Sequence, residues 1–166
     1  MKSPGCKLLI MGLPGSGKTT LARALAPMIH AVHFNADEVR AHLNKDLGYS
    51  IADRIEQAAR MGWLCDQVVK AGVVAIADFV CPTRETRAAF KSGGNAFVVW
   101  IDRIDAGRFE DTNRLFTPPE EFDVRVLRAG SPQHWAGLIA EKLGFNRRPQ
   151  SSAVVVSLSD FRSSLT

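Results

Sequence analysis

The segment GLPGSGKT at residues 12–19 follows an apolar run, KLLIM, at residues 7–11. From Lys18 onward, apolar side chains recur at helical spacing at Leu21 and Leu25. The segment therefore joins a predicted strand to a predicted helix, which is the context that the pattern G-x-x-x-x-G-K-[ST] requires in order to bind phosphate. A glycine turn with an incidental lysine is the alternative, and the flanking strand and helix argue against it.

The residue types in this loop suit a nucleoside triphosphate. Glycine lets the backbone approach phosphate oxygens closely enough for its N–H groups to bond them, and the helix that follows contributes its dipole. We expect Lys18 to reach the β and γ phosphates and the Thr19 hydroxyl to bind magnesium. The predicted cofactors are therefore ATP and Mg2+. The predicted cofactor-binding residues are Gly12, Pro14, Gly15, Ser16, Gly17, Lys18, Thr19 and Thr20.

The rest of the chain alternates short apolar runs with helical patterns. Strands are predicted at residues 7–11, 32–34, 73–77, 96–101 and 123–127, and helices from residues 18 and 37 onward and at 51–71, 84–91 and 132–143. Continuous apolar runs are typical of strands buried on both faces of a parallel sheet. The alternation predicts an α/β fold of the P-loop NTPase class, a three-layer sandwich whose parallel sheet is flanked by helices. In such folds, ligands bind at the carboxyl ends of the strands.

The length of the chain fits a single domain, residues 1–166. Residues 103–119 carry many charges and two prolines, which is typical of a mobile, lid-like segment. Residues 146–166 are interpreted as a tail, in which the run at 154–156 is a candidate edge strand. No apolar run approaches the roughly 20 residues that span a bilayer, and no secretory signal is evident, so we expect a cytoplasmic protein without a membrane partner. A homodimer stays a possibility.

The composition favours an anionic substrate. The net charge of +4 suits a nucleotide or a nucleic acid. The three cysteines form no C-x-x-C pair, so we expect free thiols rather than a zinc site or a disulfide framework. The four histidines show no metal-ligand spacing and are given no role, and the three tryptophans are expected in the core.

Two aspartates are predicted to take part in phosphoryl transfer. Asp78 comes directly after an apolar run, where folds of this class carry a magnesium-side carboxylate, and a cap or turn acceptor before Pro82 is the alternative. Asp37 closes a predicted strand, where it could accept the proton of an attacking hydroxyl or hold a metal-bound water. Its alternative is a cap of the helix that follows.

Arginines are predicted to complete the site. Arg40 and Arg54 fall on helices near the end of the second strand, and guanidinium groups suit phosphate or sulfate oxygens. Arg103, Arg108 and Arg114 fall in the lid-like segment, where closure would bring one of them onto the transferring phosphoryl group. The sequence does not choose among these three.

Five stretches of the chain form a recognisable set: GLPGSGKTTLA at 12–22, NADEVR at 35–40, LNKDLGYS at 43–50, Asp53-Arg54 and AGV at 71–73. Together they resemble the adenylylsulfate (APS) kinase family over residues 7–101. The resemblance implies an enzyme that phosphorylates the 3′ hydroxyl of adenylylsulfate with MgATP. It also implies that Arg40, Tyr49 and Arg54 contact the acceptor nucleotide.

The chain departs from the family pattern at acceptor-side positions. Asn35 replaces the first aspartate of the family's D-G-D, and Gln57 stands where the family has an acceptor-binding asparagine. In the family motif S-F-I-S-P, Asp78 replaces the first serine, Cys81 replaces the second, and Phe79 keeps the phenylalanine. These changes leave room for a different acceptor.

The lid differs as well. The family's K-G-L-Y-K-K-A-R run is absent, and a shorter segment at residues 107–119 takes its place. Phe116-Thr117 is matched to the family's F-T-G, which predicts that Phe116 stacks on a base opposite Tyr49. A bacteriophage branch of APS-kinase-like enzymes phosphorylates 5-hydroxymethyluracil in DNA, and a short lid on a basic chain suits such a bulky acceptor.

We therefore predict an ATP-dependent kinase that transfers the γ-phosphoryl group to a hydroxyl of a nucleotide-like acceptor, APS or a related nucleotide. A kinase of 5-hydroxymethyluracil in modified DNA is one alternative, and a nucleotide-binding ATPase switch is another. The predicted catalytic residues are Lys18, Asp37, Arg40 and Asp78, and the predicted metal ligands are Thr19 and Asp78. The predicted substrate-binding residues are Asp37, Arg40, Tyr49, Arg54, Gln57, Phe79 and Phe116.

Overall fold

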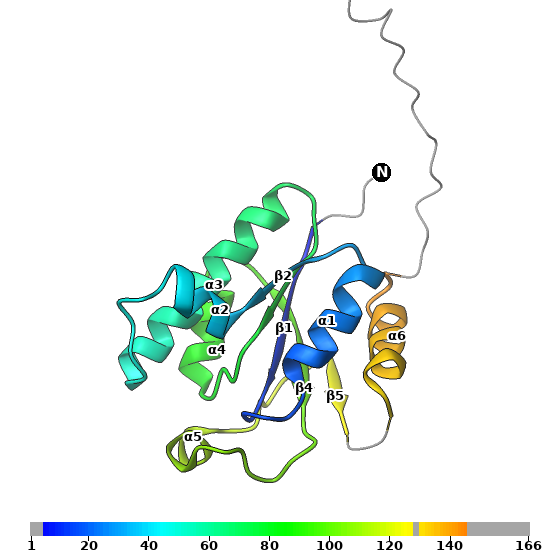
Figure 1. Cartoon of the computed structure of the whole chain (residues 1–166). Helices are drawn as coiled ribbons and strands as arrows, with labels where there is room; N and C mark the ends of the chain where they lie inside the picture. Colours follow the sequence, from blue (N-terminus) through cyan, green and yellow to red (C-terminus); the bar gives the residue numbers. More distant parts are fainter. Residues whose placement is uncertain (1–4, 128–129, 146–166) are drawn as a thin grey trace, which may run out of the picture.

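The computed structural model describes residues 5–127 and 130–145, so the predicted tail lies outside the described residues. A five-stranded parallel sheet in the order β2-β3-β1-β4-β5 carries helices on both faces (Figure 1). This confirms the predicted α/β fold of the P-loop class. The strands are β1 (Lys7–Gly12), β2 (Val32–Asn35), β3 (Ala75–Asp78), β4 (Ala96–Ile101) and β5 (Val124–Val126). The helices are α1 (Lys18–Met28), α2 (Ala36–His42), α3 (Ile51–Lys70), α4 (Arg84–Lys91), α5 (Glu110–Leu115) and α6 (Pro132–Lys142).

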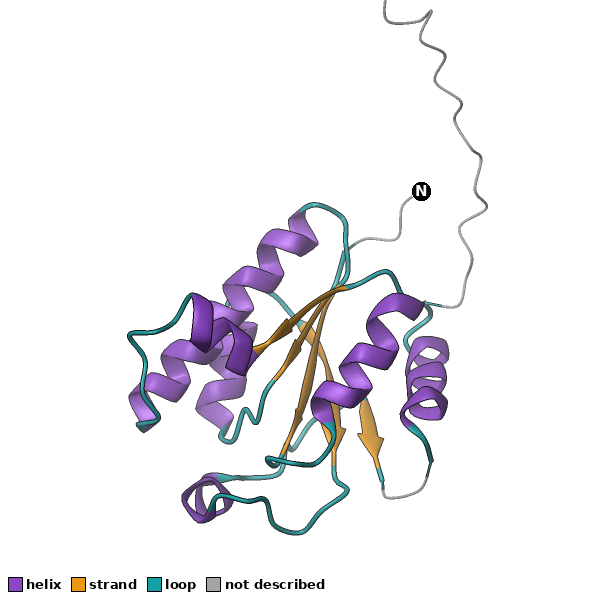
Figure 2. Cartoon of the chain, in the orientation of Figure 1, coloured by secondary structure: helices purple, strands orange, loops and turns teal. Residues whose placement is uncertain are grey.

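Alternating side chains of β1 divide the core into two halves. Leu8 and Ile10 belong to the half built with α1 and α6, whereas Leu9 and Met11 belong to the half built with α3 and α4. All four side chains are fully buried. Figure 2 shows the corresponding helices on either side of the sheet. Because β1 is covered on both faces, the loop that follows it starts from a rigid point at the carboxyl edge of the sheet.

A buried ion pair holds the other end of β1. Lys7 is 1% exposed, and its ammonium group lies 2.7 Å from Asp66 of α3 and donates to the Phe90 carbonyl oxygen of α4 at 2.9 Å. Gly93 leaves room for this pair, because a Cβ at that position would lie 2.1 Å from an Asp66 carboxylate oxygen. A buried charge is costly unless it is paired and hydrogen-bonded, and Lys7 satisfies both conditions. The pair therefore ties α3 and α4 to β1.

Three details differ from the sequence-based expectations. Trp63, expected in the core, is 62% exposed on α3, whereas Trp100 is buried and Trp135 packs against the core. The lid-like segment at 103–119 is partly ordered as helix α5. Strand β3 includes Asp78 instead of ending before it. In the described part of the chain, no helix is both long and apolar enough to span a bilayer.

Replacing Lys7 with methionine tests the buried pair, because the variant keeps the length of the side chain and leaves Asp66 without its partner. Removing one member of a buried pair costs about 3–5 kcal/mol, and we expect about 3 kcal/mol here because Asp66 keeps some access to water. Urea unfolding followed by circular dichroism measures the change. Lys45→Met on an exposed loop is the matched control and should stay within roughly 0.5 kcal/mol of wild type. Equal losses in the two variants would contradict the role of the pair.

Candidate active site

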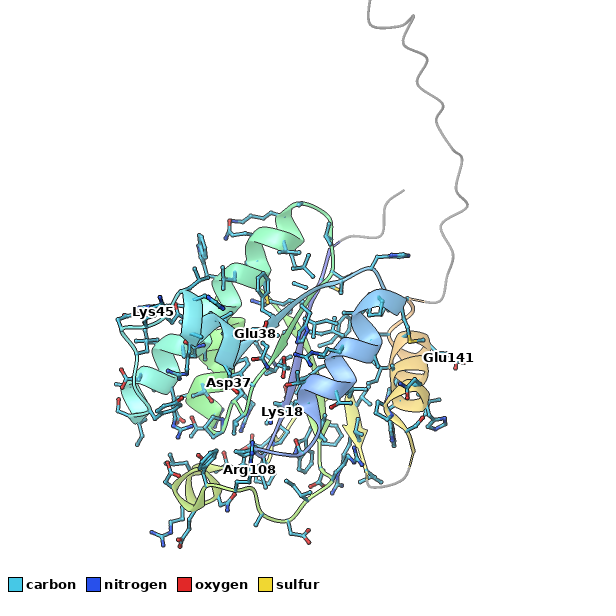
Figure 3. All side chains as sticks on the ribbon, viewed as in Figure 1. Lys18, Asp37, Glu38, Lys45, Arg108 and Glu141 are labelled. Atoms are coloured by element: carbon cyan, nitrogen blue, oxygen red, sulfur yellow. The ribbon has the colours of Figure 1, made fainter. Side chains whose placement is uncertain are left out.

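A cavity of about 840 Å³ lies at the carboxyl ends of the strands. Figure 3 shows Lys18 of α1, Asp37 of α2 and Arg108 of the segment leading into α5 around the same open region. The cavity therefore joins the phosphate-binding loop to the arginine-bearing segments. Its lining residues are Pro14, Gly15, Gly17, Lys18, Thr19, Thr20, Asn35, Ala36, Asp37, Arg40, Tyr49, Arg54, Asp78, Phe79, Val80, Cys81, Pro82, Arg108, Phe109, Asp111 and Thr112.

The loop after β1 has the conformation that phosphate binding requires. Gly15 and Gly17 have φ angles of 83° and 100°, a left-handed conformation that glycine adopts without strain. The Lys18 ammonium group folds back and donates to the Leu13 carbonyl oxygen at 2.9 Å. The Ser16 hydroxyl is buried and has no hydrogen-bond partner among the described residues. This orphaned hydroxyl fits a phosphate oxygen.

The charges around Lys18 favour a polyanion. Burial lowers the pKa of Lys18 to about 8, while the charges of Asp78 and Asp37 act in the opposite direction. The charge of Arg108 also lowers the pKa of Lys18, so the two cations face the same region. A phosphate group bound between them would favour the charged form of the lysine, because an opposite charge raises the pKa of an amine.

Thr19 and Asp78 meet at the inner corner of the cavity. The Thr19 hydroxyl donates to Asp78 Oδ2 at 2.7 Å, and Asp78 is 1% exposed. Hydroxyl and carboxylate oxygens suit Mg2+, which takes few protein ligands and completes its shell with water and phosphate oxygens. The described residues contain no group of three or more His, Cys, Asp or Glu side chains placed to hold a metal ion. The corner fits magnesium that arrives with a triphosphate.

The capping roles considered for the two aspartates are not found. Helix α2 is capped by Asn35, whose side-chain oxygen accepts from the backbone N–H groups of Asp37 and Glu38. Asp37 therefore lies in the first turn of α2, where it is exposed and lines the cavity. Helix α4, which follows Asp78, is capped by Thr83. Both aspartates line the cavity, and their catalytic and metal-binding roles stay predictions.

The residues that the family resemblance assigns to the acceptor form one cluster. Arg40 donates to the Gly48 carbonyl oxygen at 2.7 Å, and its guanidinium group lies 4.7 Å from the centre of the Tyr49 ring. The Arg54 Nε donates to the Tyr49 carbonyl oxygen at 2.9 Å, and its guanidinium group lies 5.7 Å from the same ring. The Tyr49 side chain is largely exposed. An aromatic face between two cations thus borders the cavity opposite the phosphate loop.

Two predicted substrate-binding residues do not line the cavity. Gln57 is 2% exposed, accepts from Asn44 at 2.8 Å and donates to the Ala36 carbonyl oxygen at 3.3 Å, so it supports the start of α2. Phe116 packs against the core and is absent from the lining of the cavity. In its place, the exposed ring of Phe109 lines the cavity. The predicted direct contacts of Gln57 and Phe116 with an acceptor are therefore not met in this structure.

The structure separates the three arginines of the lid-like segment. Arg108 lines the cavity, and Arg103 lies against the phosphate loop, with Nη1 3.2 Å from the place where a Cβ would stand on Gly17. Arg114 instead pairs with Glu110 one turn earlier in α5. Arg108 and Arg103 therefore lie nearest to the phosphate-binding loop, and the action of one of them on the transferring phosphoryl group stays a prediction.

Three further side chains line the cavity or contact a residue that lines it. Phe79 lines the cavity, as its predicted role requires. Cys81 is fully buried, and burial raises the pKa of its thiol to about 12, so it stays neutral. His33 was given no role by the sequence, yet its Nε2 lies 2.5 Å from Asp78 Oδ1. The available signal was the period of two in β2, which puts residues 33 and 35 on the same face of the strand.

A phosphate-binding loop after the first strand, a carboxylate beside its threonine and arginines across a shared cavity define a P-loop kinase. Comparison with known proteins gives the family. The model of the adenylylsulphate kinase family matches residues 4–114. This chain belongs to that family, whose members transfer a phosphoryl group to a hydroxyl.

Individual relatives agree with this assignment. The adenylyl-sulfate kinase of Synechococcus sp. strain JA-3-3Ab is 31% identical over 141 residues, which cover 81% of this chain and 76% of the relative. The adenylyl-sulfate kinase of Shewanella oneidensis is 41% identical over 143 residues, which cover 79% of this chain and 64% of the relative. These relatives give no support to the alternatives of a DNA kinase or an ATPase switch.

Comparison with solved structures also finds an APS kinase. The APS kinase of Mycobacterium tuberculosis, solved in complex with AMPPNP and APS, superposes with a TM-score of 0.75 and 22% identity. The superposition covers 85% of this chain and 98% of that one. At this identity the match establishes the shared fold.

Arg54 ties α5 to α3, since its Nη2 donates to Thr112 at 3.2 Å and lies 3.4 Å from an Asp111 carboxylate oxygen. We expect Arg54→Met to loosen this connection. A hydrogen bond to a charged group is worth about 1.5–3 kcal/mol, so amide hydrogens of α5 should exchange roughly tenfold faster. Hydrogen–deuterium exchange with mass spectrometry measures this rate. Arg114→Met, which removes a contact within α5, should leave the attachment of α5 to α3 unchanged, and equal acceleration in both variants would count against the coupling.

Proposed function

We propose that this protein is an ATP-dependent adenylylsulfate kinase, which transfers the γ-phosphoryl group of MgATP to the 3′ hydroxyl of adenylylsulfate. The observation that carries the proposal is the shared cavity, which has the phosphate loop on one side and the cluster of Arg40, Tyr49 and Arg54 on the other. Membership in the adenylylsulphate kinase family supports it.

The donor half of the cavity would hold the triphosphate. The Ser16 hydroxyl, which has no partner among the described residues, and backbone N–H groups of the loop would meet phosphate oxygens, and Lys18 would exchange its bond to the Leu13 carbonyl for the β and γ phosphates. Thr19 and Asp78 would hold magnesium, which neutralises charge on the phosphate oxygens. Arg108 would neutralise the remaining charge from the lid side.

The acceptor half suits a nucleotide that carries an anionic group. The Tyr49 ring offers an aromatic face for a base, and the exposed ring of Phe109 offers a second one. Arg40 and Arg54 would bind the phosphate and sulfate oxygens of adenylylsulfate, because guanidinium groups match such anions in two-point contacts. Their present hydrogen bonds to backbone carbonyls of 47–49 hold them ready in the cluster.

Asp37 is the proposed proton acceptor. Its carboxylate is exposed to the cavity at the start of α2. Its negative charge acts to raise the pKa of Lys18, the residue proposed to bind the donor phosphates. A base in this position would orient the acceptor hydroxyl toward the γ phosphate and take its proton as the new P–O bond forms. Enzymes catalyse phosphoryl transfer mainly by positioning the reacting groups and by stabilising the charge of the transition state.

We also propose the cytoplasm as the site of action, since the described cysteines are free thiols, which suits a reducing compartment that supplies ATP. Self-association into a homodimer stays a prediction for analytical ultracentrifugation.

The activity is tested by incubating the protein with γ-labelled ATP, Mg2+ and adenylylsulfate. We expect the label to move to adenylylsulfate, and none to move to an analogue that lacks the 3′ hydroxyl. ATP turnover that is indifferent to adenylylsulfate would overturn the proposal.

Lys18→Met keeps the length of the side chain and removes the charge that would face the β and γ phosphates. We expect kcat to fall by roughly 100-fold or more, the loss typical of removing a group that stabilises transition-state charge. Steady-state kinetics with adenylylsulfate measures the change, with Lys45→Met as the control outside the cavity. Near-normal turnover by the Lys18 variant would refute its role.

Asp37→Asn separates proton transfer from binding. If Asp37 is the base, kcat should fall by roughly 100-fold, the usual contribution of general-base catalysis, while the dissociation constant for MgATP changes little. Glu38→Gln is the matched control, because Glu38 lies in the same turn, faces Arg23 at 3.5 Å and does not line this cavity. A defect confined to ATP affinity would assign Asp37 to donor binding instead.

A further inference from the structure

The inner corner of the cavity is built from the ends of two paired strands. In the parallel pairing of β2 with β3, Asn35 is the register partner of Asp78. Register partners in a parallel pair project toward the same face from neighbouring points of the sheet edge. A side chain at either position can therefore reach the Thr19 hydroxyl, and both do so: Asn35 Nδ2 donates to Thr19 at 3.1 Å, and Asp78 accepts from it at 2.7 Å.

Asp78 is held on both sides by side chains of β2. Asn35 Nδ2 lies 3.2 Å from Oδ1 and 3.1 Å from Oδ2, while His33 Nε2 lies 2.5 Å from Oδ1. Beside a carboxylate, Nε2 is the ring nitrogen that carries the hydrogen and donates it. The Asn35 oxygen is engaged separately in capping α2. Among these three side chains, Asp78 supplies the single carboxylate.

Asn35 and Asp78 therefore occupy equivalent places at the corner, one neutral and one acidic. Two carboxylates in contact would repel each other, and a corner with none would leave a cation uncompensated. One carboxylate at either strand end satisfies both conditions.

We propose that His33 and Asn35 are positioning residues that aim Asp78 at the magnesium ion of MgATP, and that the corner works with its carboxylate on either strand end. The inference rests on the proposed binding of MgATP but not on the acceptor. Side chains that hold a metal-binding group typically contribute 10–100-fold to metal affinity, so His33 matters even though it does not touch the ion.

The first experiment moves the carboxylate. Titration calorimetry measures the association constant for ATP, once with excess Mg2+ and once with EDTA. The ratio of the two constants is the gain in ATP affinity due to magnesium. Asp78→Asn should lower this gain at least tenfold, and Asn35→Asp combined with Asp78→Asn should restore it to within about threefold of wild type. Asp at position 35 can still cap α2. An unchanged gain in the single variant, or a double variant as poor as the single one, would overturn the proposal.

The second experiment removes the donor on Asp78 and then replaces it. His33→Leu should lower the gain due to magnesium about tenfold, whereas His33→Gln, whose amide can donate from a similar place, should keep most of it. ATP affinity in EDTA and thermal unfolding should be alike in the two variants. His134→Leu on exposed α6 is the control. Equal gains in the leucine and glutamine variants would make His33 a packing residue only.

The Asp78 and His33 experiments together still decide the question if a variant misfolds or if the proposed activity is wrong. If the Asp78 variants do not fold, the His33 pair decides the question, because it leaves the corner's carboxylate in place. The gain due to magnesium needs no acceptor, so failure to phosphorylate adenylylsulfate would reject the proposed activity and leave this inference standing. Wild type that binds ATP equally well with and without magnesium would reject this inference and the proposed magnesium site, but not the transfer of phosphate to adenylylsulfate.

Discussion

The site depends on the burial of β1 on both of its faces. Leu8 and Ile10 on one side and Leu9 and Met11 on the other leave the strand no freedom to shift in register or to rotate. The buried pair of Lys7 and Asp66 holds its amino end. The loop that follows therefore leaves the sheet at a fixed place and direction, and its left-handed glycines are already in position without a ligand. Preorganisation of this kind is what electrostatic catalysis requires.

The sequence predicted the parts of the molecule that rest on backbone geometry. Strands buried on both faces are continuous apolar runs, and the glycines of 12–19 are needed for left-handed turns, so both leave signals that one sequence carries. The β3 end was predicted for a similar reason, because Asp78 interrupts an apolar run at the edge where ligands bind. These features are local, and their partners do not need to be known.

The differences between sequence and structure concern side chains whose partners are distant in the chain. Gln57 is buried against the start of α2, and Phe116 packs against the core, so neither lines the cavity and their contacts with an acceptor stay predictions. Trp63 is exposed because its face of α3 has no covering element among the described residues. No role was predicted for His33 because its partner, Asp78, lies on a different strand and far away in the sequence. Each of these roles is set by tertiary packing, which periodicity does not report.

The two halves of the cavity therefore tolerate change differently. The proposed donor half would bind phosphate through backbone N–H groups, so any substitution that disturbs the left-handed glycines would disturb several contacts at once. The proposed acceptor half is lined by side chains of α2, α3 and the segment before α5, whose replacement changes the cavity without changing the backbone of the phosphate loop. The inner corner combines both properties: the register of β2 with β3 is rigid, but it brings two side chains to the same point. This rigid pairing is the basis of the proposal that either strand end can supply the carboxylate of the corner.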